Sequence, residues 1–200
     1  RLDPNEVADI LDQSETGTEL SEHQKNYHSK TKIRDNAILT LFLGTGIRIS
    51  ELIGLNIDDI DFNSNAFTVV RKGGNSTILY FSDEVANALR KYLDERCLSD
   101  KISQDEPALF LSMQNRRIST KAVQNLVTKY ARIISPLKKI TPHKLRSTFG
   151  TELYRATGDI YVVADVLGHR DVNTTKKHYA ALDSEIRKNA ARKVILRDDE

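Results

Sequence analysis

The chain has 200 residues, of which 39% are hydrophobic and 29% are charged, and its formal net charge is +2. This length suits one globular domain with at most a short appendage. The single cysteine, Cys97, cannot form an internal disulfide, and no apolar run approaches the roughly 20 residues that a membrane-spanning helix needs. Composition therefore argues against a disulfide-rich secreted protein and a membrane protein, and it favours a cytoplasmic one.

The charges are unevenly distributed along the chain. Residues 1–30 carry seven acidic and three basic side chains, whereas residues 116–150 carry nine Lys or Arg and no Asp or Glu. A basic surface neutralises phosphates and releases counterions, which drives DNA binding whatever the base sequence. Charge alone is equally compatible with a solvated basic face.

The N-terminal third is predicted to contain two helices separated by a loop. Asp3 followed by Pro4 is typical of a helix start, because a capping residue precedes a proline in the first turn. Residues 17–32 are polar and are predicted to form a loop. From 33 to 43 the apolar residues recur at helical spacing, and Gly44 to Gly46 ends that helix. Arg48 is therefore expected just beyond a glycine break.

A hairpin and a series of helices follow. Residues 67–70 and 77–80 are predicted strands, joined around the Lys72-Gly-Gly-Asn75 turn. Further helices are predicted over residues 82–97, 119–134, 142–157, 160–167 and 173 to about 192. The predicted fold class is therefore α+β, mainly helical, with a small antiparallel sheet.

Two segments carry side chains suited to binding and activating a phosphodiester. Arg48 lies in the sequence TGIRISEL, in which Glu51 is one helical turn away and is its candidate partner. His143 and Arg146 lie three residues apart at the start of a predicted helix, so they share one face. Arginine binds two phosphate oxygens at once and stays charged, whereas histidine exchanges protons near neutrality.

A third segment adds a histidine and a tyrosine. His169 follows Leu167-Gly168, and Tyr179 lies ten residues further on, among polar residues. Tyrosine can attack phosphorus and hold it covalently. Tyr161 is the only other tyrosine near these motifs, and it precedes the Leu-Gly-His element.

These segments together resemble the catalytic domain of a tyrosine recombinase, the lambda-integrase family of site-specific DNA recombinases, and among them the integrases of phages and conjugative transposons. The similarity runs from about Asp3 to the C-terminus and is densest over residues 45–55, 141–149 and 165–179. It implies the tyrosine-recombinase catalytic fold.

The resemblance implies how the phosphate is bound and the leaving group released. Arg48 and Arg146 would clamp the scissile phosphate, while Glu51 would hold the first arginine segment in place. Lys72, in a turn that resembles the family's mobile hairpin, would be the general acid toward the leaving 5′ oxygen. The neighbouring Arg71 holds its proton too firmly to donate it.

The resemblance also assigns the groups on the attacking side. Tyr179 would be the nucleophile, His143 its general base or acid, and His169 a hydrogen-bonding partner of the phosphate. The family often has a histidine two places after the tyrosine, where this chain has Ala181, with His178 before the tyrosine instead.

The implied reaction is DNA strand cleavage and rejoining through a 3′-phosphotyrosine link. No metal, ATP or other cofactor is expected, because the arginines neutralise the phosphate and the covalent link conserves the bond energy. Two other functions stay open. One is a type IB topoisomerase, which relaxes a single duplex with a similar site, and the other is a DNA-binding regulator with the same fold and no chemistry.

The resemblance further implies a domain organisation and a set of partners. Residues 1–182 would form the catalytic domain and residues 183–200 a helical tail, and the family's upstream DNA-clamping domain would be absent from this chain. An apolar stripe recurs every four residues at Leu182, Ile186, Ala190 and Val194. The tail would either fold back on its own domain or pass to a neighbouring subunit in a tetrameric complex on double-stranded DNA.

Overall fold

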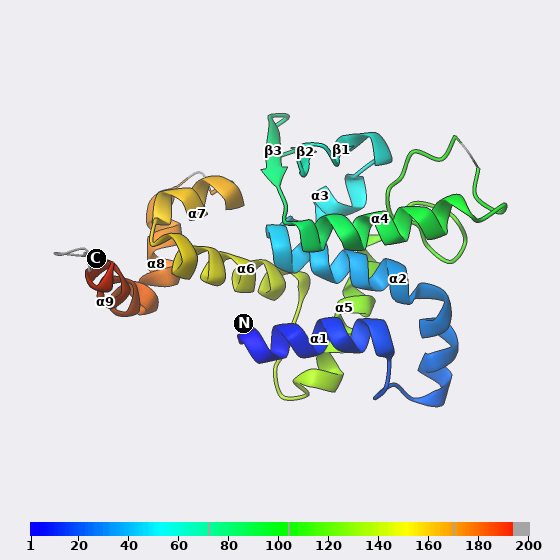
Figure 1. Cartoon of the computed structure of the whole chain (residues 1–200), viewed down its shortest axis with the longest axis horizontal. Coiled ribbons are helices and arrows are strands. Elements are labelled where there is room, and N and C mark those ends of the chain that lie inside the picture. Colours follow the sequence, from blue (N-terminus) through cyan, green and yellow to red (C-terminus); the bar gives the residue numbers. More distant parts are fainter. Residues whose placement is uncertain (72, 104, 170, 194–200) are drawn as a thin grey trace, which may run out of the picture. The chain divides into compact units, whose positions relative to one another are not determined.

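The computed structural model describes residues 1–71, 73–103, 105–169 and 171–193, and Figure 1 shows its helices and strands. The chain divides into two compact units, residues 1–148 and 149–200, and each is described by itself. The structure is mainly helical with one small antiparallel sheet, which confirms the predicted fold class.

The first unit is built around a long central helix. Its helices are α1 (Pro4–Thr16), α2 (Glu22–Thr45), α3 (Ile49–Gly54), α4 (Asp83–Cys97), α5 (Thr120–Ile134) and the start of α6 (Pro142–Thr157). Helices α1 and α4 both pack against α2, and α5 packs against α1 and α3 (Figure 1). Side-chain oxygens of Asp3, Ser82 and Ser119 cap α1, α4 and α5, so the predicted starts of these helices are confirmed.

The predicted loop over residues 17–32 is wrong, because α2 already begins at Glu22. Ser21 and Gln24 form a capping box, in which each side chain bonds the backbone of the other. The first turns of α2 are polar but not fully solvated, since His28 is buried and its Nε2 lies 3.0 Å from the carbonyl oxygen of Ser14. The apolar periodicity begins only at Ile33, which is why it located only the second half of the helix.

The three-stranded antiparallel sheet has the order β1-β2-β3. A 3₁₀ turn (Ile57–Asp59) leads into β1 (Ile60–Asp61), β2 (Ala66–Val70) and β3 (Ser76–Tyr80). Thr68 pairs with Ile78 and Val70 with Ser76, so the predicted hairpin is confirmed with each strand one residue longer at its start. Its turn closes where the amide of Gly74 donates to the carbonyl of Arg71 at 3.0 Å.

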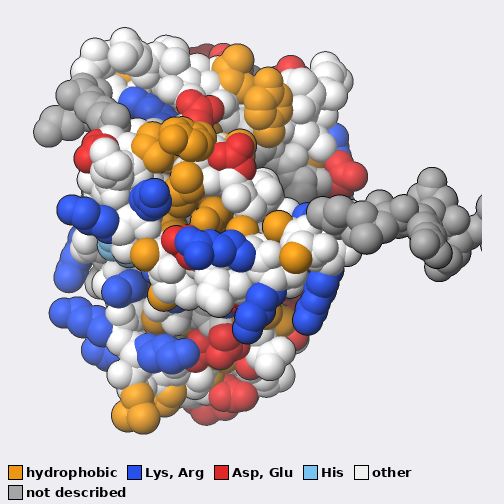
Figure 2. Space-filling view, turned by 90° about the vertical axis from the view of Figure 1, so that its left-hand side faces the viewer, with side chains coloured by type: hydrophobic (Ala, Val, Ile, Leu, Met, Phe, Trp, Pro, Cys, Tyr) orange, Lys and Arg blue, Asp and Glu red, His pale blue; other side chains and the backbone are white. Residues whose placement is uncertain are grey.

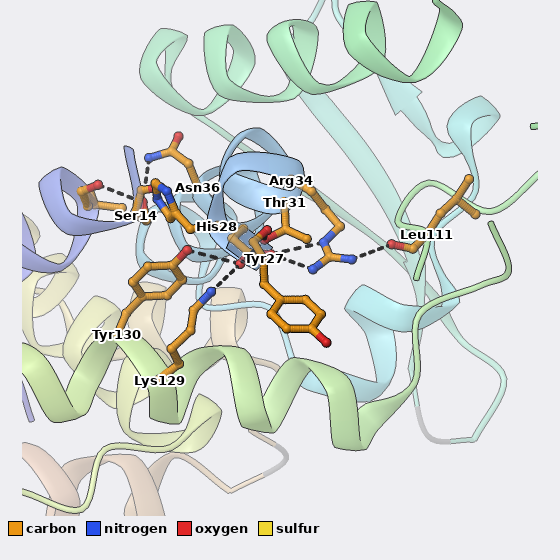
Figure 3. Close-up of polar contacts among 11 residues, drawn as sticks. Ser14, Tyr27, His28, Thr31, Arg34, Asn36, Leu111, Lys129 and Tyr130 are labelled. Atoms are coloured by element: carbon orange, nitrogen blue, oxygen red, sulfur yellow. Dashed lines mark hydrogen bonds and ion pairs between the residues drawn. The ribbon is translucent and has the colours of Figure 1, made fainter. Parts of the chain in front are cut away.

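The buried carboxylate of Asp35 joins α2 to α5, and Figure 3 labels the side chains that donate to it. Asp35 is only 1% exposed, and it accepts hydrogen bonds from Thr31, Arg34, Lys129 and Tyr130 at 2.7 to 3.2 Å. Burial, followed by the nearby Asp35, raises the pKa of Tyr130, so this hydroxyl stays a donor. A buried charge with this many donors holds the two helices in one register.

Glu6 on α1 anchors the segment that leads into α6. Its carboxylate accepts hydrogen bonds from Lys138 Nζ at 2.6 Å, Ser135 Oγ at 2.8 Å and the Asp3 amide at 2.8 Å. Burial alone would raise the pKa of Glu6, but these donors, Lys138 foremost, lower it to about 2. The ionised carboxylate therefore stabilises the folded state.

We expect this contact to make stability depend on pH in the acid range. The folded pKa of Glu6 is lower than its ordinary value of 4.5, so the stabilisation is complete above about pH 4.5 and is lost as the pH falls toward 2. Glu6→Gln should lower the free energy of unfolding at pH 7 by about 1 kcal/mol, since Lys138 is half exposed and solvent screens the pair. Urea unfolding at a series of pH values measures the difference between wild type and variant.

Glu22→Gln is the matched control for this pH dependence. Glu22 also pairs with a lysine, Lys25, but its side chain is 90% exposed, so its removal should change stability little. A gap between wild type and Glu6→Gln that stayed constant down to pH 2 would contradict the assigned role of Glu6.

The second unit is a small helical assembly with its own core. It contains the rest of α6, α7 (Ile160–Leu167), α8 (Val172–Tyr179), a 3₁₀ turn (Ala180–Leu182) and α9 (Asp183–Arg192). Tyr154, Val163, Leu167, Tyr179 and Leu182 form its buried cluster.

The single helix predicted from residue 173 to about 192 is wrong, because the 3₁₀ turn divides it. Residues three apart eclipse in a 3₁₀ turn, and this turn places both Tyr179 and Leu182 in the core. Of the apolar stripe, Ile186 packs against the same cluster whereas Ala190 is exposed, and Val194 lies outside the described residues. The described part of the tail thus packs on its own unit.

Candidate active site

A hydrogen bond between residues 100 positions apart joins two of the predicted motifs. Arg146 on α6 is only 7% exposed, and its Nη1 donates to the carbonyl oxygen of Gly46. Gly46 ends α2 in the left-handed region, with φ of 63°, which favours glycine and turns the chain toward α3. Since Arg48 follows two residues later, the structure brings the segments of both predicted clamp arginines to one place.

Arg48 is oriented by Glu51, as the sequence suggested. Its Nη1 donates to Glu51 Oε1 at 2.8 Å, and its backbone amide donates to Oε2 at 2.9 Å at the start of α3. Glu51 is 8% exposed, while the side chain of Arg48 remains about one-third exposed. The carboxylate therefore fixes the position of the guanidinium and leaves part of it at the surface.

His143 lies in the first turn of α6, one turn before Arg146. The two residues differ in environment, because His143 is exposed and Arg146 is buried. An exposed histidine at a helix start can exchange protons with a ligand at the surface. Lys72 lies outside the described residues, but the hairpin that carries it is described on both sides of that position.

His169 is held by a hydrogen bond within the second unit. It follows Gly168, which ends α7 in the left-handed region, and its Nδ1 lies 2.6 Å from Thr175 Oγ1 on α8. Thr175 is fully buried, so the contact fixes the imidazole ring against α8. Nε2 is the ring atom opposite this anchor.

Tyr179 ends α8 and is buried, with only 1% of the residue exposed. The expectation of a polar setting is wrong for its side chain, although its sequence neighbours Lys176, Lys177 and His178 are exposed. The Tyr179 ring packs against Tyr154, with ring centroids 6.2 Å apart, and meets His178 edge-on at 4.8 Å. By contrast, Tyr161 is 70% exposed.

Basic side chains are exposed along the first unit. In the stretch that has no acidic residue, seven Lys or Arg are exposed: Arg116, Arg117, Lys121, Arg132, Lys138, Lys139 and Lys144. Figure 2 shows one face of the molecule, on which Lys and Arg side chains occur in several groups with Asp and Glu between some of them. This distribution suits a polyanionic ligand.

Sequence reasoning missed the two residues that hold the motifs in place. From the sequence, Gly46 is predicted only to end a helix, and Thr175 lies within residues 165–179 with no predicted role. Within the described residues, no group of three or more His, Cys, Asp or Glu is arranged to hold a metal ion. Across the same part of the chain, no helix has both the length and the apolar character needed to cross a membrane.

The structure is mainly helical with a small sheet, joins two arginine segments at one turn, and carries a histidine and a tyrosine in its second unit. These features define the class of protein as tyrosine-recombinase catalytic domains. The chain belongs to the Phage integrase family, whose model matches residues 1–185.

Two relatives illustrate the similarity. The tyrosine recombinase XerC of Thermodesulfovibrio yellowstonii is 41% identical over 146 residues, which cover 72% of this chain and 48% of that protein. The crystal structure of XerA recombinase superposes with a TM-score of 0.77 at 27% identity, covering 98% of this chain and 65% of that one. The chain spans about half the length of the curated relatives that it matches.

A third comparison concerns the fold alone. The Tn1549 transposon integrase, in complex with a circular intermediate DNA, has a TM-score of 0.71 at 19% identity, covering 96% of this chain and 65% of that one.

Proposed function

We propose that this chain is the catalytic part of a site-specific DNA recombinase that cleaves and rejoins strands through a 3′-phosphotyrosine link. The observation that carries the proposal is the hydrogen bond from Arg146 to the Gly46 carbonyl, beside Arg48. This bond joins the segment that carries Arg146 to the segment that carries Arg48, so one anionic ligand can contact cationic groups from both. A phosphodiester matches the planar donors of two guanidinium groups.

The proposed reaction assigns one task to each of the six residues. The hydroxyl of Tyr179 attacks phosphorus and gives its proton to His143. Arg48, Arg146 and His169 stabilise the charge that develops on the phosphoryl oxygens. The bond from phosphorus to the 5′ oxygen breaks, and that oxygen takes a proton from Lys72. A 5′-hydroxyl from a partner duplex then attacks the phosphotyrosine and reverses the step.

The partner in this proposal is double-stranded DNA. Support comes from the seven exposed basic residues within 116–150 and from the DNA-bound Tn1549 integrase, which has the same fold. Because the substrate is cellular DNA, we expect the protein in the cytoplasm of a bacterial cell.

Covalent capture tests the proposed function without a defined target sequence. The protein is incubated with nicked duplexes that carry randomised bases around the nick, so that a short strand diffuses away after cleavage and traps the link. We expect covalent complexes, and sequencing of the trapped DNA identifies the site. Absence of any covalent complex, also when the expected upstream DNA-clamping domain is joined to the chain, would contradict the proposal.

Strand exchange then separates recombination from topoisomerase activity. Two duplexes that carry the recovered site and different end labels are mixed with the protein. A recombinase joins one label to the other, whereas a type IB topoisomerase only reseals each duplex and relaxes supercoils. A regulator without chemistry would produce neither result.

We also propose that residues 183–200 couple neighbouring subunits in a tetrameric complex on DNA. To reach a neighbouring subunit, α9 would have to give up its contacts with its own unit. The main ones are the hydrogen bond from Tyr154 Oη to Asp183 at 3.0 Å, the ion pair of Arg155 with Glu185, and the packing of Ile186. An apolar stripe that is only partly covered favours a second partner.

Two truncations test the coupling. Deleting residues 187–200 preserves the contacts of Asp183, Glu185 and Ile186, and we expect it to weaken complex assembly and strand exchange by at least about tenfold, a contribution of about 1.4 kcal/mol. Deleting residues 183–200 should in addition disturb Tyr179. Native gel assembly and strand exchange, with the expected upstream DNA-clamping domain joined to the chain, measure both effects. Normal assembly by both truncated proteins would show that α9 only packs on its own unit.

A further inference from the structure

A glycine within α6 lies opposite the hydroxyl of Tyr179. A Cβ atom at Gly150 would overlap with Tyr179 Oη, and it would lie 3.0 Å from Tyr179 Cζ and 2.9 Å from Leu167 Cδ1. Glycine is a poor helix former, so helix formation does not explain this residue in the interior of α6. The missing side chain leaves the space that the tyrosine hydroxyl fills.

The surroundings of this space exclude a large ligand. Tyr179 belongs to the buried cluster with Tyr154, Val163 and Leu167, and only 1% of it is exposed. A DNA phosphate has to come within bonding distance of the attacking oxygen. The tyrosine whose oxygen would attack is therefore buried in this structure.

We propose that Gly150 is a positioning residue, whose missing side chain forms a seat for the Tyr179 hydroxyl between reactions, and that the ring has to leave this seat to attack. This inference rests on the proposed function, in which Tyr179 is the nucleophile. A larger residue at position 150 narrows the seat, and the exposed orientations of Tyr179 become more populated.

The sign of the stability change tests whether the seat is filled. Alanine is the better helix former, so Gly→Ala in an open helical position leaves the melting temperature unchanged or raises it. Gly54, at the end of α3, is the matched control, because nothing lies within 4 Å of a Cβ built there. For Gly150→Ala we expect the opposite, a fall in melting temperature of about 5 °C or more.

A double-mutant cycle identifies the group that fills the seat. Tyr179→Phe removes the oxygen that would overlap with the new Cβ, so Gly150→Ala should cost at most half as much in that background. If Gly150→Ala alone does not fold, the comparison of Tyr179→Phe with the double variant still measures the cost of the alanine. An equal loss in both backgrounds, or a rise in melting temperature like that of Gly54→Ala, would overturn the proposal.

Two further readouts respond only if the nucleophile is released. In DNA-free protein, nitration of Tyr179 by tetranitromethane should be several-fold faster in Gly150→Ala, with the exposed Tyr161 as internal standard. Covalent trapping on nicked DNA, well below the melting temperature, should also be several-fold faster. If Gly150→Ala left the nitration rate of Tyr179 unchanged, or left trapping unchanged or slower, the proposed role of Gly150 would be overturned.

Failure of the seat can be told apart from failure of the proposed function. If Tyr179→Phe still traps DNA, Tyr179 is not the nucleophile. The proposal that a nucleophile leaves the seat then fails as well, even if the melting temperatures and the nitration rates show that Tyr179 packs against Gly150. If Tyr179→Phe abolishes trapping while Gly150→Ala behaves like Gly54→Ala, only the seat fails.

Discussion

Arg146→Ala is expected to slow DNA cleavage by about 10²- to 10³-fold while lowering non-specific DNA affinity only a few-fold. The buried guanidinium acts most strongly when negative charge builds up on the phosphate, and loss of one such donor typically costs 10²- to 10³-fold. Affinity, in contrast, is spread over many phosphate contacts. Single-turnover cleavage on nicked DNA and filter binding at fixed salt measure the two quantities.

Two control variants separate position from charge. Arg132→Ala removes the same charge from an exposed site on α5, so it should change affinity and cleavage to a similar, small extent. Arg146→Lys retains the charge but not the planar pair of donors, and its rate should lie between those of wild type and Arg146→Ala. If cleavage by Arg146→Ala fell only in proportion to affinity, Arg146 would not be part of the clamp.

Lys72→Ala should lose about 10²- to 10⁴-fold in cleavage rate, and a chemical change in the substrate should restore most of it. When sulfur replaces the bridging 5′ oxygen of the scissile phosphate, the leaving group departs without a proton. A variant that lacks only the general acid then cleaves nearly as fast as wild type.

The rescue has to be specific to Lys72. Arg71→Ala removes the neighbouring positive charge in the same hairpin, and Arg146→Ala removes phosphate stabilisation, so neither should recover on the sulfur substrate. Equal rescue of all three variants would remove Lys72 from the role of general acid.

The fold was predictable where local signals decide it. Capping residues and apolar periodicity located α1, α4, α5, α6 and α7, and two short strands around glycines gave the hairpin. The error in α2 came from relying on apolar spacing alone, because Ser21 and Gln24 already carried the capping signal. Helix α3 is not predicted, because its six residues are too few to show an apolar periodicity. Near its end, Arg117 Nη1 donates to the carbonyls of Ile53 and Leu55, more than 60 residues away.

The candidate site divides in the same way between local and distant contacts. The spacing of His143 and Arg146 on one helix follows from the sequence. The contact of His169 with Thr175 is also local, because the two residues are only six positions apart. The bond from Arg146 to Gly46 spans 100 residues, and no periodicity predicts it; only the family resemblance placed both arginines in one site. The burial of Tyr179 was missed because its sequence neighbours are polar, whereas its ring packs on Tyr154 from α6.

Mass spectrometry of the covalent complex tests the central claim most directly. The complex trapped on nicked DNA is digested with protease and nuclease, and the peptide that carries the nucleotide is sequenced. We predict a 3′-phosphoryl nucleotide on Tyr179, and no complex with Tyr179→Phe. A nucleotide on Tyr161 or any other residue, or trapping by Tyr179→Phe at the wild-type level, would contradict the proposed mechanism.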